Sequence, residues 1–188
     1  MNNLLRIVAI TGMPGAGKST AAQALVKEGW KRVVMGDVIR AETKRRGLEP
    51  TAKNTGEVMK RLRRERGESA VADLCLEVIS RLGADKVVVD GIRSVAEVDA
   101  FRKRAEVTLV VVDASSARRY ALLKERGRSD DPLTQEMFQD RDLRELGVGI
   151  GEAIALADAT VSNESATTEE LEREMASVVK RWLDNVST

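Results

Sequence analysis

A glycine-rich stretch near the N-terminus carries the clearest chemical signal in this sequence. The run "RIVAITGMPGAGKSTAAQAL" at 6–25 places an apolar segment before Gly12-x-x-x-x-Gly17-Lys18-Ser19 and a helix-forming segment after it. Glycines let the backbone curl so that several N–H groups face phosphate oxygens, and the start of the following helix also favours anions. A strand, such a loop and a helix in this order form the phosphate-loop pattern. We therefore predict that this turn holds a nucleoside triphosphate.

The residues that close this loop supply the charges that a bound triphosphate needs. Lys18 can reach the β- and γ-phosphates, and the hydroxyl of Ser19 can ligate Mg²⁺. Asp90 ends a later apolar run and would orient water molecules on the same ion. The expected cofactors are ATP and Mg²⁺, and the residues expected to bind ATP are Gly12, Met13, Pro14, Gly15, Ala16, Gly17, Lys18, Ser19 and Thr20.

Other motifs exclude several classes of phosphate-loop protein. A GTPase would need Asn-Lys-x-Asp to read guanine, and the sequence contains no such motif. A motor-type ATPase usually has a glutamate after the strand-end aspartate to activate water, whereas Gly91 follows Asp90 here. The chain has no histidine, which removes histidine general bases and the usual zinc sites. Transfer of a phosphoryl group to a bound acceptor is therefore favoured over hydrolysis.

Two further stretches resemble the acceptor-binding segments of adenylate kinase and other nucleoside monophosphate kinases. They are "VVMGDVIRAETKRRG" at 33–47 and "KVVVDGIRS" at 86–94, the second without the proline of that family. The resemblance implies that Arg40 and Arg93 clamp the phosphate of the acceptor, which a planar guanidinium can hold bidentately. It also implies that Asp37 lies at the mouth of the same crevice. For an acceptor with a hydroxyl group, Asp37 could act as the catalytic base.

The segment "GRSDD" at 127–131 resembles the short mobile lid of UMP/CMP kinases. The resemblance implies that Arg128 of the lid, together with Arg141 of the next helix, neutralises the charge that develops on the transferred phosphoryl group. Closure of such a lid also excludes water. The predicted lid spans about residues 126–142.

The helix after the lid has a predicted start and a predicted cationic face. Asp131 and Pro132 are interpreted as its N-cap and first residue. Arg141 and Arg144 are three residues apart and share a face, so both could point at the phosphates. A salt-bridged surface helix is the alternative, because nearby carboxylates could pair with both arginines: Asp140, Asp142 and Glu145.

Over nearly its whole length, the chain resembles an archaeal family of small nucleotide-kinase-like proteins that is related to CMP, AMP and dephospho-CoA kinases. The resemblance implies a kinase fold that binds ATP, and it leaves the acceptor open. We predict an ATP-dependent phosphotransferase of the nucleoside monophosphate kinase type. A dephospho-CoA kinase is the first alternative, and a non-catalytic or RNA-linked nucleotide switch is an alternative of another class.

A strongly basic region separates the two predicted acceptor segments. It contains Lys44, Arg45, Arg46, Lys53 and the run "KRLRRERG" at 60–67. Three interpretations remain open for this region. It is a solvated helix whose charges are offset by neighbouring glutamates, a pocket for an acceptor with more than one phosphate, or an RNA-binding surface. The aromatic content of 3% disfavours the last, because stacking of bases needs aromatic rings.

The elements that must position these residues alternate along the chain. Short β-branched runs are predicted as strands at 7–11, 33–35, 87–90, 107–112 and 159–162, with helical segments between them. Apolar runs separated by helices are typical of a parallel sheet that is covered on both faces. We predict a three-layer α/β fold of the phosphate-loop NTPase type, similar to that of nucleoside monophosphate kinases, with about five parallel strands.

The domain organisation follows from length and pattern. A chain of 188 residues without repeats or linkers predicts one domain, 1–188, with an acceptor-binding flap at about 37–82. The last helix should begin at a capping box, Thr167-x-x-Glu170. Its apolar face should consist of Leu171, Met175, Val178 and Trp182.

Composition bounds the cellular context and the partners. A net charge of +1 argues against a surface that binds nucleic acid or anionic membrane as a whole. Cys75 lies in an apolar run and is predicted to be buried, and one cysteine forms no internal disulfide. No signal peptide and no apolar run of about 18 residues is present. We expect a cytoplasmic protein whose partner is a small nucleotide-like acceptor, without nucleic acid or membrane, and of undetermined oligomeric state.

Overall fold

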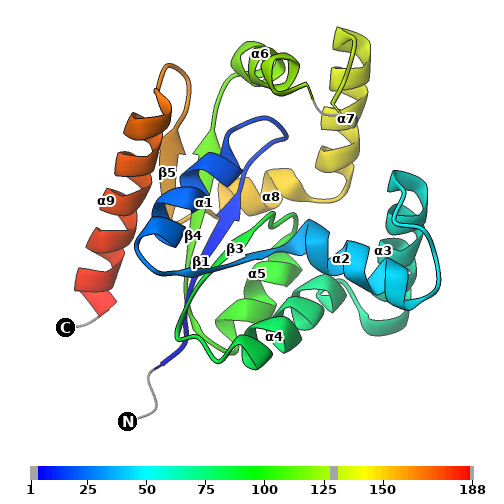
Figure 1. Cartoon of the computed structure of the whole chain (residues 1–188), viewed down its shortest axis with the longest axis horizontal. Helices are drawn as coiled ribbons and strands as arrows, with labels where there is room; N and C mark the ends of the chain where they lie inside the picture. The colour runs from blue at the N-terminus through cyan, green and yellow to red at the C-terminus, as the bar shows by residue number, and fades with distance from the viewer. Residues whose placement is uncertain (1–3, 128–130, 187–188) are drawn as a thin grey trace.

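The computed structural model describes residues 4–127 and 131–186. Within these residues, five parallel strands form one sheet in the order β2-β3-β1-β4-β5 (Figure 1). The central strand β1 pairs with β3 on one side and with β4 on the other. The predicted α/β fold with a parallel sheet is therefore confirmed. The strands are β1 (Arg6–Thr11), β2 (Lys31–Val34), β3 (Lys86–Asp90), β4 (Glu106–Asp113) and β5 (Ala159–Ser162).

Helices cover both faces of the sheet, which explains why its strands are apolar on both sides. In β1, Val8 and Ile10 join one core cluster, whereas Ile7 and Ala9 join the other. The first face carries α1 (Lys18–Lys27) and α9 (Thr168–Val186), and the second carries α4 (Ala70–Leu82), α5 (Val95–Arg102) and α8 (Ile150–Ala155). None of the helices in the described part of the chain is both long and apolar enough to span a bilayer.

The last helix, α9, begins and packs as the sequence predicts. The side chain of Thr167 accepts a hydrogen bond from the backbone N of Glu170 at 3.2 Å, and the Glu170 carboxylate accepts one from the backbone N of Thr167 at 2.8 Å. The predicted apolar face lies against the core beside α1: Leu171, Met175, Val178 and Trp182. Reciprocal capping starts the helix and burial of its face holds it on the sheet.

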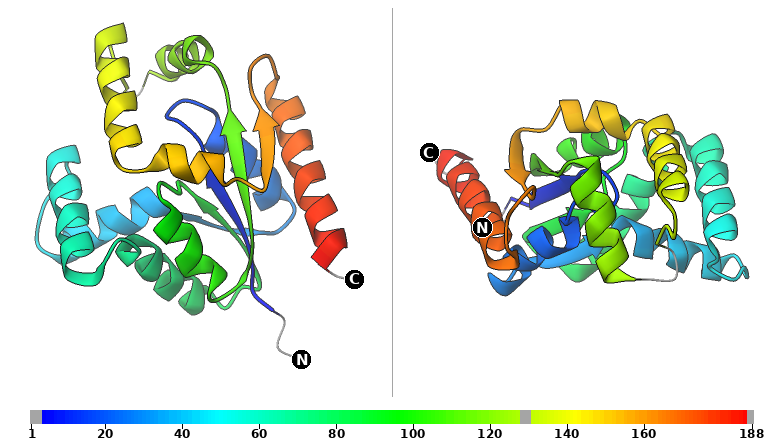
Figure 2. Two further views of the ribbon diagram at one scale, coloured as in Figure 1. Left: turned by 180° about the vertical axis from the view of Figure 1, so that it is seen from behind. Right: turned by 90° about the horizontal axis from the view of Figure 1, so that it is seen from above.

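The remaining helices surround the end of the sheet to which the strand arrows point (Figures 1 and 2). They are α2 (Met35–Arg45), α3 (Ala52–Arg66), α6 (Ser116–Arg126) and α7 (Gln135–Gly147). The predicted flap at 37–82 covers most of α2, all of α3 and α4. However, α4 belongs to the main core, where Cys75 is fully buried as predicted. Helices α2 and α3 contribute to the same core through Met35, Ile39, Val58 and Leu62.

The end of the second strand differs from the prediction. The strand predicted at 33–35 ends at Val34, and Met35 already begins α2. The side chain of Met35 is buried in the core, and Asp37 in the first turn complements the positive end of the helix dipole. Asp37 therefore lies in a helix and does not extend a strand.

The start of α7 also corrects a prediction. Asp131 and Pro132 are not its N-cap and first residue, because the helix begins at Gln135. The N-cap is Thr134, whose hydroxyl accepts a hydrogen bond from the backbone N of Met137 at 3.2 Å. The Asp131 carboxylate cannot cap the helix because the guanidinium of Arg126 holds it, with one hydrogen bond of 2.9 Å.

The packing of α9 predicts the effect of one substitution. Met175→Ala should lower the free energy of unfolding by about 2–5 kcal/mol, because the buried methionine would leave a cavity. Urea denaturation followed by circular dichroism measures this change. Glu174→Ala is the matched control, since Glu174 is exposed on the same helix and its loss should change stability by less than about 0.5 kcal/mol. Equal unfolding midpoints for the two variants would contradict this packing.

Candidate active site

The loop between β1 and α1 follows a path that requires glycine at Gly12, Gly15 and Gly17, and the first and last of these lie against the ends of strands. At Gly12 (φ +138°), an added Cβ would lie 2.3 Å from the carbonyl oxygen of Val112 in β4. At Gly17 (φ +99°), it would lie 2.5 Å from the side-chain nitrogen of Asn163, just after β5. The loop is therefore pressed against the ends of two neighbouring strands. These contacts hold its backbone in a curve in front of α1.

Lys18 directs its charge into this curve. Its Nζ donates hydrogen bonds to the carbonyl oxygens of Gly12 at 2.6 Å and Met13 at 3.0 Å. Burial lowers the pKa of Lys18 to about 8, and the nearby Asp90 carboxylate opposes that shift. A lysine that carbonyl oxygens hold beside a curved loop is well placed to meet phosphate oxygens.

Ser19 and Asp90, the two residues predicted to hold Mg²⁺, lie next to each other at the end of β3. The Ser19 hydroxyl donates to Oδ2 of Asp90 at 3.4 Å, and Arg32 of β2 donates to the same oxygen at 2.5 Å. Hydroxyl and carboxylate oxygens suit Mg²⁺. The described residues contain no group of three or more His, Cys, Asp or Glu side chains that could hold a metal. A magnesium ion here would therefore depend on phosphate and water oxygens as well.

A cavity of about 540 Å³ lies over the phosphate loop. Among the described residues, five arginines line it together with Lys18 and Ser19: Arg40 of α2, Arg93 after β3, Arg118 and Arg126 of α6, and Arg141 of α7. The cavity also reaches the start of α9, where Arg118, Asn163 and Thr168 line it. The fold thus brings together residues that lie more than 100 positions apart in the sequence.

Arg93 is held at both its backbone and its side chain. Its Nε donates to the Glu145 carboxylate of α7 at 2.9 Å, and its backbone N donates to the Glu97 carboxylate of α5 at 2.8 Å. Glu97 is almost fully buried, and burial raises its pKa. The other Glu97 oxygen accepts a hydrogen bond from Arg63 of α3 at 3.2 Å. One buried carboxylate therefore joins the Arg93 loop to α3.

Three further predicted residues have different outcomes. The Asp37 carboxylate is 64% exposed, pairs with Arg40 and is not part of the cavity wall. Arg144 is exposed and donates to the backbone of its own helix, at Asp140, so it does not share the orientation of Arg141 toward the cavity. Arg128 lies outside the described residues.

Sequence reasoning missed two residues that support the loop. The Asn163 side chain donates to the carbonyl oxygen of Ala16 at 2.9 Å, and Arg119 donates to that of Pro14 at 3.0 Å. Asn163 follows the last strand at the carboxyl edge of the sheet, where functional residues gather, so its position could have indicated it. Arg119 has no such signal, because "ARRY" is typical of a solvated helix.

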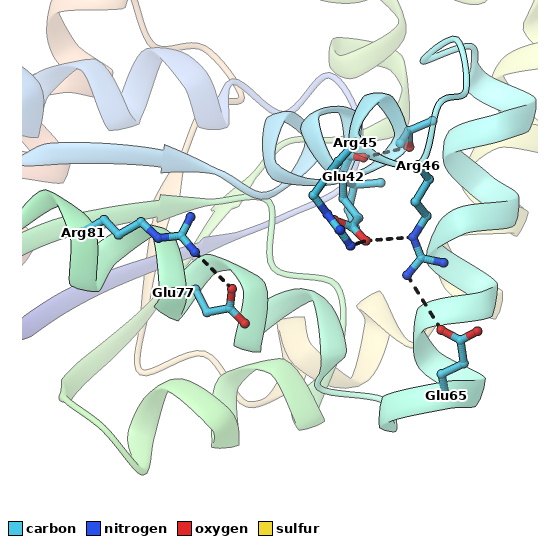
Figure 3. A network of polar contacts seen from close by, with 8 residues as sticks. Glu42, Arg45, Arg46, Glu65, Glu77 and Arg81 are labelled. Carbon is cyan, nitrogen blue, oxygen red and sulfur yellow. Dashed lines mark hydrogen bonds and ion pairs between the residues drawn. The ribbon is translucent and has the colours of Figure 1, made fainter.

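The basic region forms ion pairs of its own. Figure 3 shows Glu42 of α2 between Arg45 and Arg46, with Arg46 extending toward Glu65 of α3. The hydrogen bond from Arg45, with help from Arg46, lowers the pKa of Glu42 to about 2. The described residues that line the cavity over the phosphate loop include none from 60–67. A separate open cavity between α2 and α3 is lined by Arg45, Arg46, Arg61 and Arg64, together with Glu57 and Glu65. The ion pairs favour the interpretation as a solvated helix with offset charges over that as an acceptor pocket.

Solved structures with this fold include kinases. A shikimate kinase from Bacteroides thetaiotaomicron superposes with a TM-score of 0.59 at 16% identity, over 95% of this chain and 98% of its own. A sugar kinase from Janibacter sp. HTCC2649 superposes with a TM-score of 0.58 at 17% identity, over 96% of this chain and 95% of its own. At such low identity the likeness shows the fold alone, which is that of a phosphate-loop kinase.

Relatives at higher identity identify the family. An AAA domain family model matches residues 11–137. The UPF0200 protein of Methanocaldococcus jannaschii is 46% identical over 96% of this chain and 92% of its own length. That of Thermococcus kodakarensis is 44% identical over 96% of this chain and 97% of its own length. With the fold and the phosphate loop described above, these matches show that the chain belongs to the UPF0200 family and contains a kinase-like phosphate-loop domain.

Proposed function

We propose that this protein transfers the γ-phosphoryl group of ATP, together with Mg²⁺, to a small nucleotide-like acceptor, and that a nucleoside monophosphate is the favoured acceptor. The observation that carries the proposal is the shared cavity. It joins the phosphate loop, with Lys18, to Arg40, Arg93 and Arg141. Two phosphorylated ligands that meet in one cavity need cations on both sides of the transferred group.

The chain supplies these charges from distinct elements. Lys18 would neutralise the phosphates of ATP, while Ser19 and Asp90 would hold Mg²⁺ with its water molecules. Arg141 would neutralise the charge on the group in transfer. Arg128 keeps the role predicted for a lid arginine. No glutamate follows Asp90 to activate water, which supports transfer over hydrolysis.

The acceptor side supports a ligand that carries its own anionic oxygen. Arg40 and Arg93 each have a carboxylate partner, Asp37 and Glu145, which a phosphate dianion would replace. Asp37 is outside the cavity wall, so it would have to release Arg40 and turn inward to deprotonate a hydroxyl group. A monophosphate needs no such base. Dephospho-CoA, whose acceptor is a hydroxyl group, would need one.

An acceptor panel tests the proposal directly. Purified protein would be incubated with ATP, Mg²⁺ and each nucleoside monophosphate, its deoxy form or dephospho-CoA, and ADP would be measured. We expect a monophosphate to stimulate ADP release. Stimulation by dephospho-CoA alone would show that the acceptor group is a hydroxyl and not a phosphate. Binding of ATP without stimulation by any acceptor would contradict the kinase proposal and favour a nucleotide switch.

Variants on the acceptor side separate the two chemistries. Arg40→Ala or Arg93→Ala should raise KM for a monophosphate about tenfold or more, because a charge-assisted contact is worth about 1.5–3 kcal/mol. Asp37→Asn should retain measurable turnover. Arg104→Ala, an exposed arginine away from the cavity, is the control. If the acceptor has a hydroxyl group, Asp37→Asn should instead slow turnover by about 10²–10⁴-fold. Full activity of both arginine variants would overturn the assignment of the acceptor site.

The pKa of Lys18 predicts how ATP affinity depends on pH. Because this pKa is about 8, the lysine loses its charge above that pH, and a bound triphosphate must restore its proton. Affinity should then weaken about tenfold for each pH unit above 8, until the pKa of the complex is reached. Titration with a fluorescent ATP analogue measures this dependence. Lys18→Arg, which stays charged, is the control and should show a flatter profile. An affinity in the wild type that stays constant well above pH 8 would contradict the role of Lys18.

A further inference from the structure

Arg119 of α6 connects the phosphate loop to the helix that carries Arg141. Its side chain is only 5% exposed. Nη1 donates to the carbonyl oxygen of Pro14 in the loop at 3.0 Å and to Oδ1 of Asp142 in α7 at 2.9 Å. Nη2 donates to Oδ2 of Asp142 at 2.5 Å and to the Ser116 hydroxyl at 3.1 Å. One planar group therefore bridges two segments that are far apart in sequence.

Aromatic packing fixes the same junction. The Arg119 guanidinium lies 4.9 Å from the ring centroid of Phe138, which is buried one turn before Asp142 in α7. Tyr120 of α6 packs against the same ring, with 5.4 Å between centroids. The charge and the ring together set where α7 lies over α6. Lysine could not make the same contacts as Arg119, since its ammonium group is a point charge and lacks the planar set of donors of a guanidinium.

The position of Asp142 matters because its neighbours line the cavity. Arg141 directly precedes it, and Glu145 follows one turn later with its hydrogen bond to Arg93. A helix of 13 residues moves largely as one body, so a shift of Asp142 also shifts Arg141 and Glu145. By contrast, Arg119 is not part of the cavity wall. Any influence of Arg119 on bound phosphates must pass through other residues.

We infer that Arg119 is a positioning residue that ties the phosphate loop to α7, so that the conformation of the loop and the position of Arg141 are set together. This inference rests on the proposed function for its consequence in turnover. Arg119 contacts the loop at the Pro14 carbonyl and α7 at the Asp142 carboxylate, so a shift of the loop should shift α7 as well. The bidentate contact gives the link a defined geometry in addition to charge.

Hydrogen exchange of the protein without added ligand tests the link itself. Arg119→Lys should speed amide exchange both in α7 (Gln135–Gly147) and in the loop at 12–17, and leave α9 unchanged. Asp140→Asn is the matched control, because Asp140 is an exposed acid on the same helix. Faster exchange in α7 alone, or no more change than in the control, would overturn the link. This arm does not depend on any catalytic activity.

Kinetics test the consequence for the reaction. Arg119→Lys should lower kcat at least about tenfold and change KM for ATP by less than about threefold, because misplacement of a charged group acts mainly on the transition state. Asp142→Asn should have a similar effect, and the double variant should be little worse than either single one, since both remove one connection. An effect on KM for ATP alone, or fully additive losses, would contradict the inference. A wild type without transferase activity would refute the proposed function, and the exchange measurement would still decide the link.

If Arg119→Lys does not fold, Asp142→Asn takes its place in the exchange experiment. This variant leaves Arg119 its contact with Pro14 and removes one charge of the pair. It should loosen α7 more than the loop. Equal protection of α7 in Asp142→Asn and Asp140→Asn would overturn the inference.

Discussion

The constraint on which the site depends is the close contact between the phosphate loop and the ends of its neighbouring strands. At Gly12 the backbone passes so near the carbonyl oxygen of Val112 that no side chain fits, and at Gly17 it passes equally near Asn163. The strands behind the loop belong to a rigid core, so the loop has little freedom to relax. Its curve is therefore a property of the packed sheet as much as of the loop sequence. Everything that faces the cavity takes its position relative to this curve.

Partnered cations are the second feature of the site. Lys18 is held by loop carbonyls, Arg93 by Glu145 and Arg40 by Asp37. Each side chain is thereby aimed before a phosphate arrives, which reduces the ordering that binding would require. The partner anions also keep several like charges close together in one cavity. In the proposed reaction, phosphate oxygens would replace these partner carboxylates, which lie on α2 and α7.

Two helices at the periphery of the fold, α3 and α7, are anchored by buried charged groups. Besides its apolar contacts with the core, α3 is held through Arg63 by the buried Glu97, which also binds the backbone of Arg93. The helix α7 reaches the loop through Arg119. Such pairs add little net stability, because the cost of taking both charges out of water offsets their attraction. Their geometry links the Arg93 loop and the phosphate loop to neighbouring helices.

Local signals in the sequence determined much of this protein. The glycine spacing around Lys18, the apolar strands and the reciprocal cap at Thr167 act over a few residues, so the loop, the sheet and the start of α9 were predictable. Arg40, Arg93 and Arg141 line one cavity, as their positions in the predicted motifs suggested. These features depend either on residues that are close together in the sequence or on a motif that occurs at a fixed place in this type of fold.

Tertiary structure alone decided the rest. Helix α2 begins at Met35, whose side chain enters the core, and α7 begins after its cap Thr134, while Asp131 pairs with Arg126. Arg119 became a link only because folding placed Pro14 and Asp142 on either side of it. Asp37 faced solvent because its helix turned it away from the cavity. In each case the outcome depends on packing or on a contact with a residue that is distant in the sequence. A local sequence pattern contains no information about such a contact.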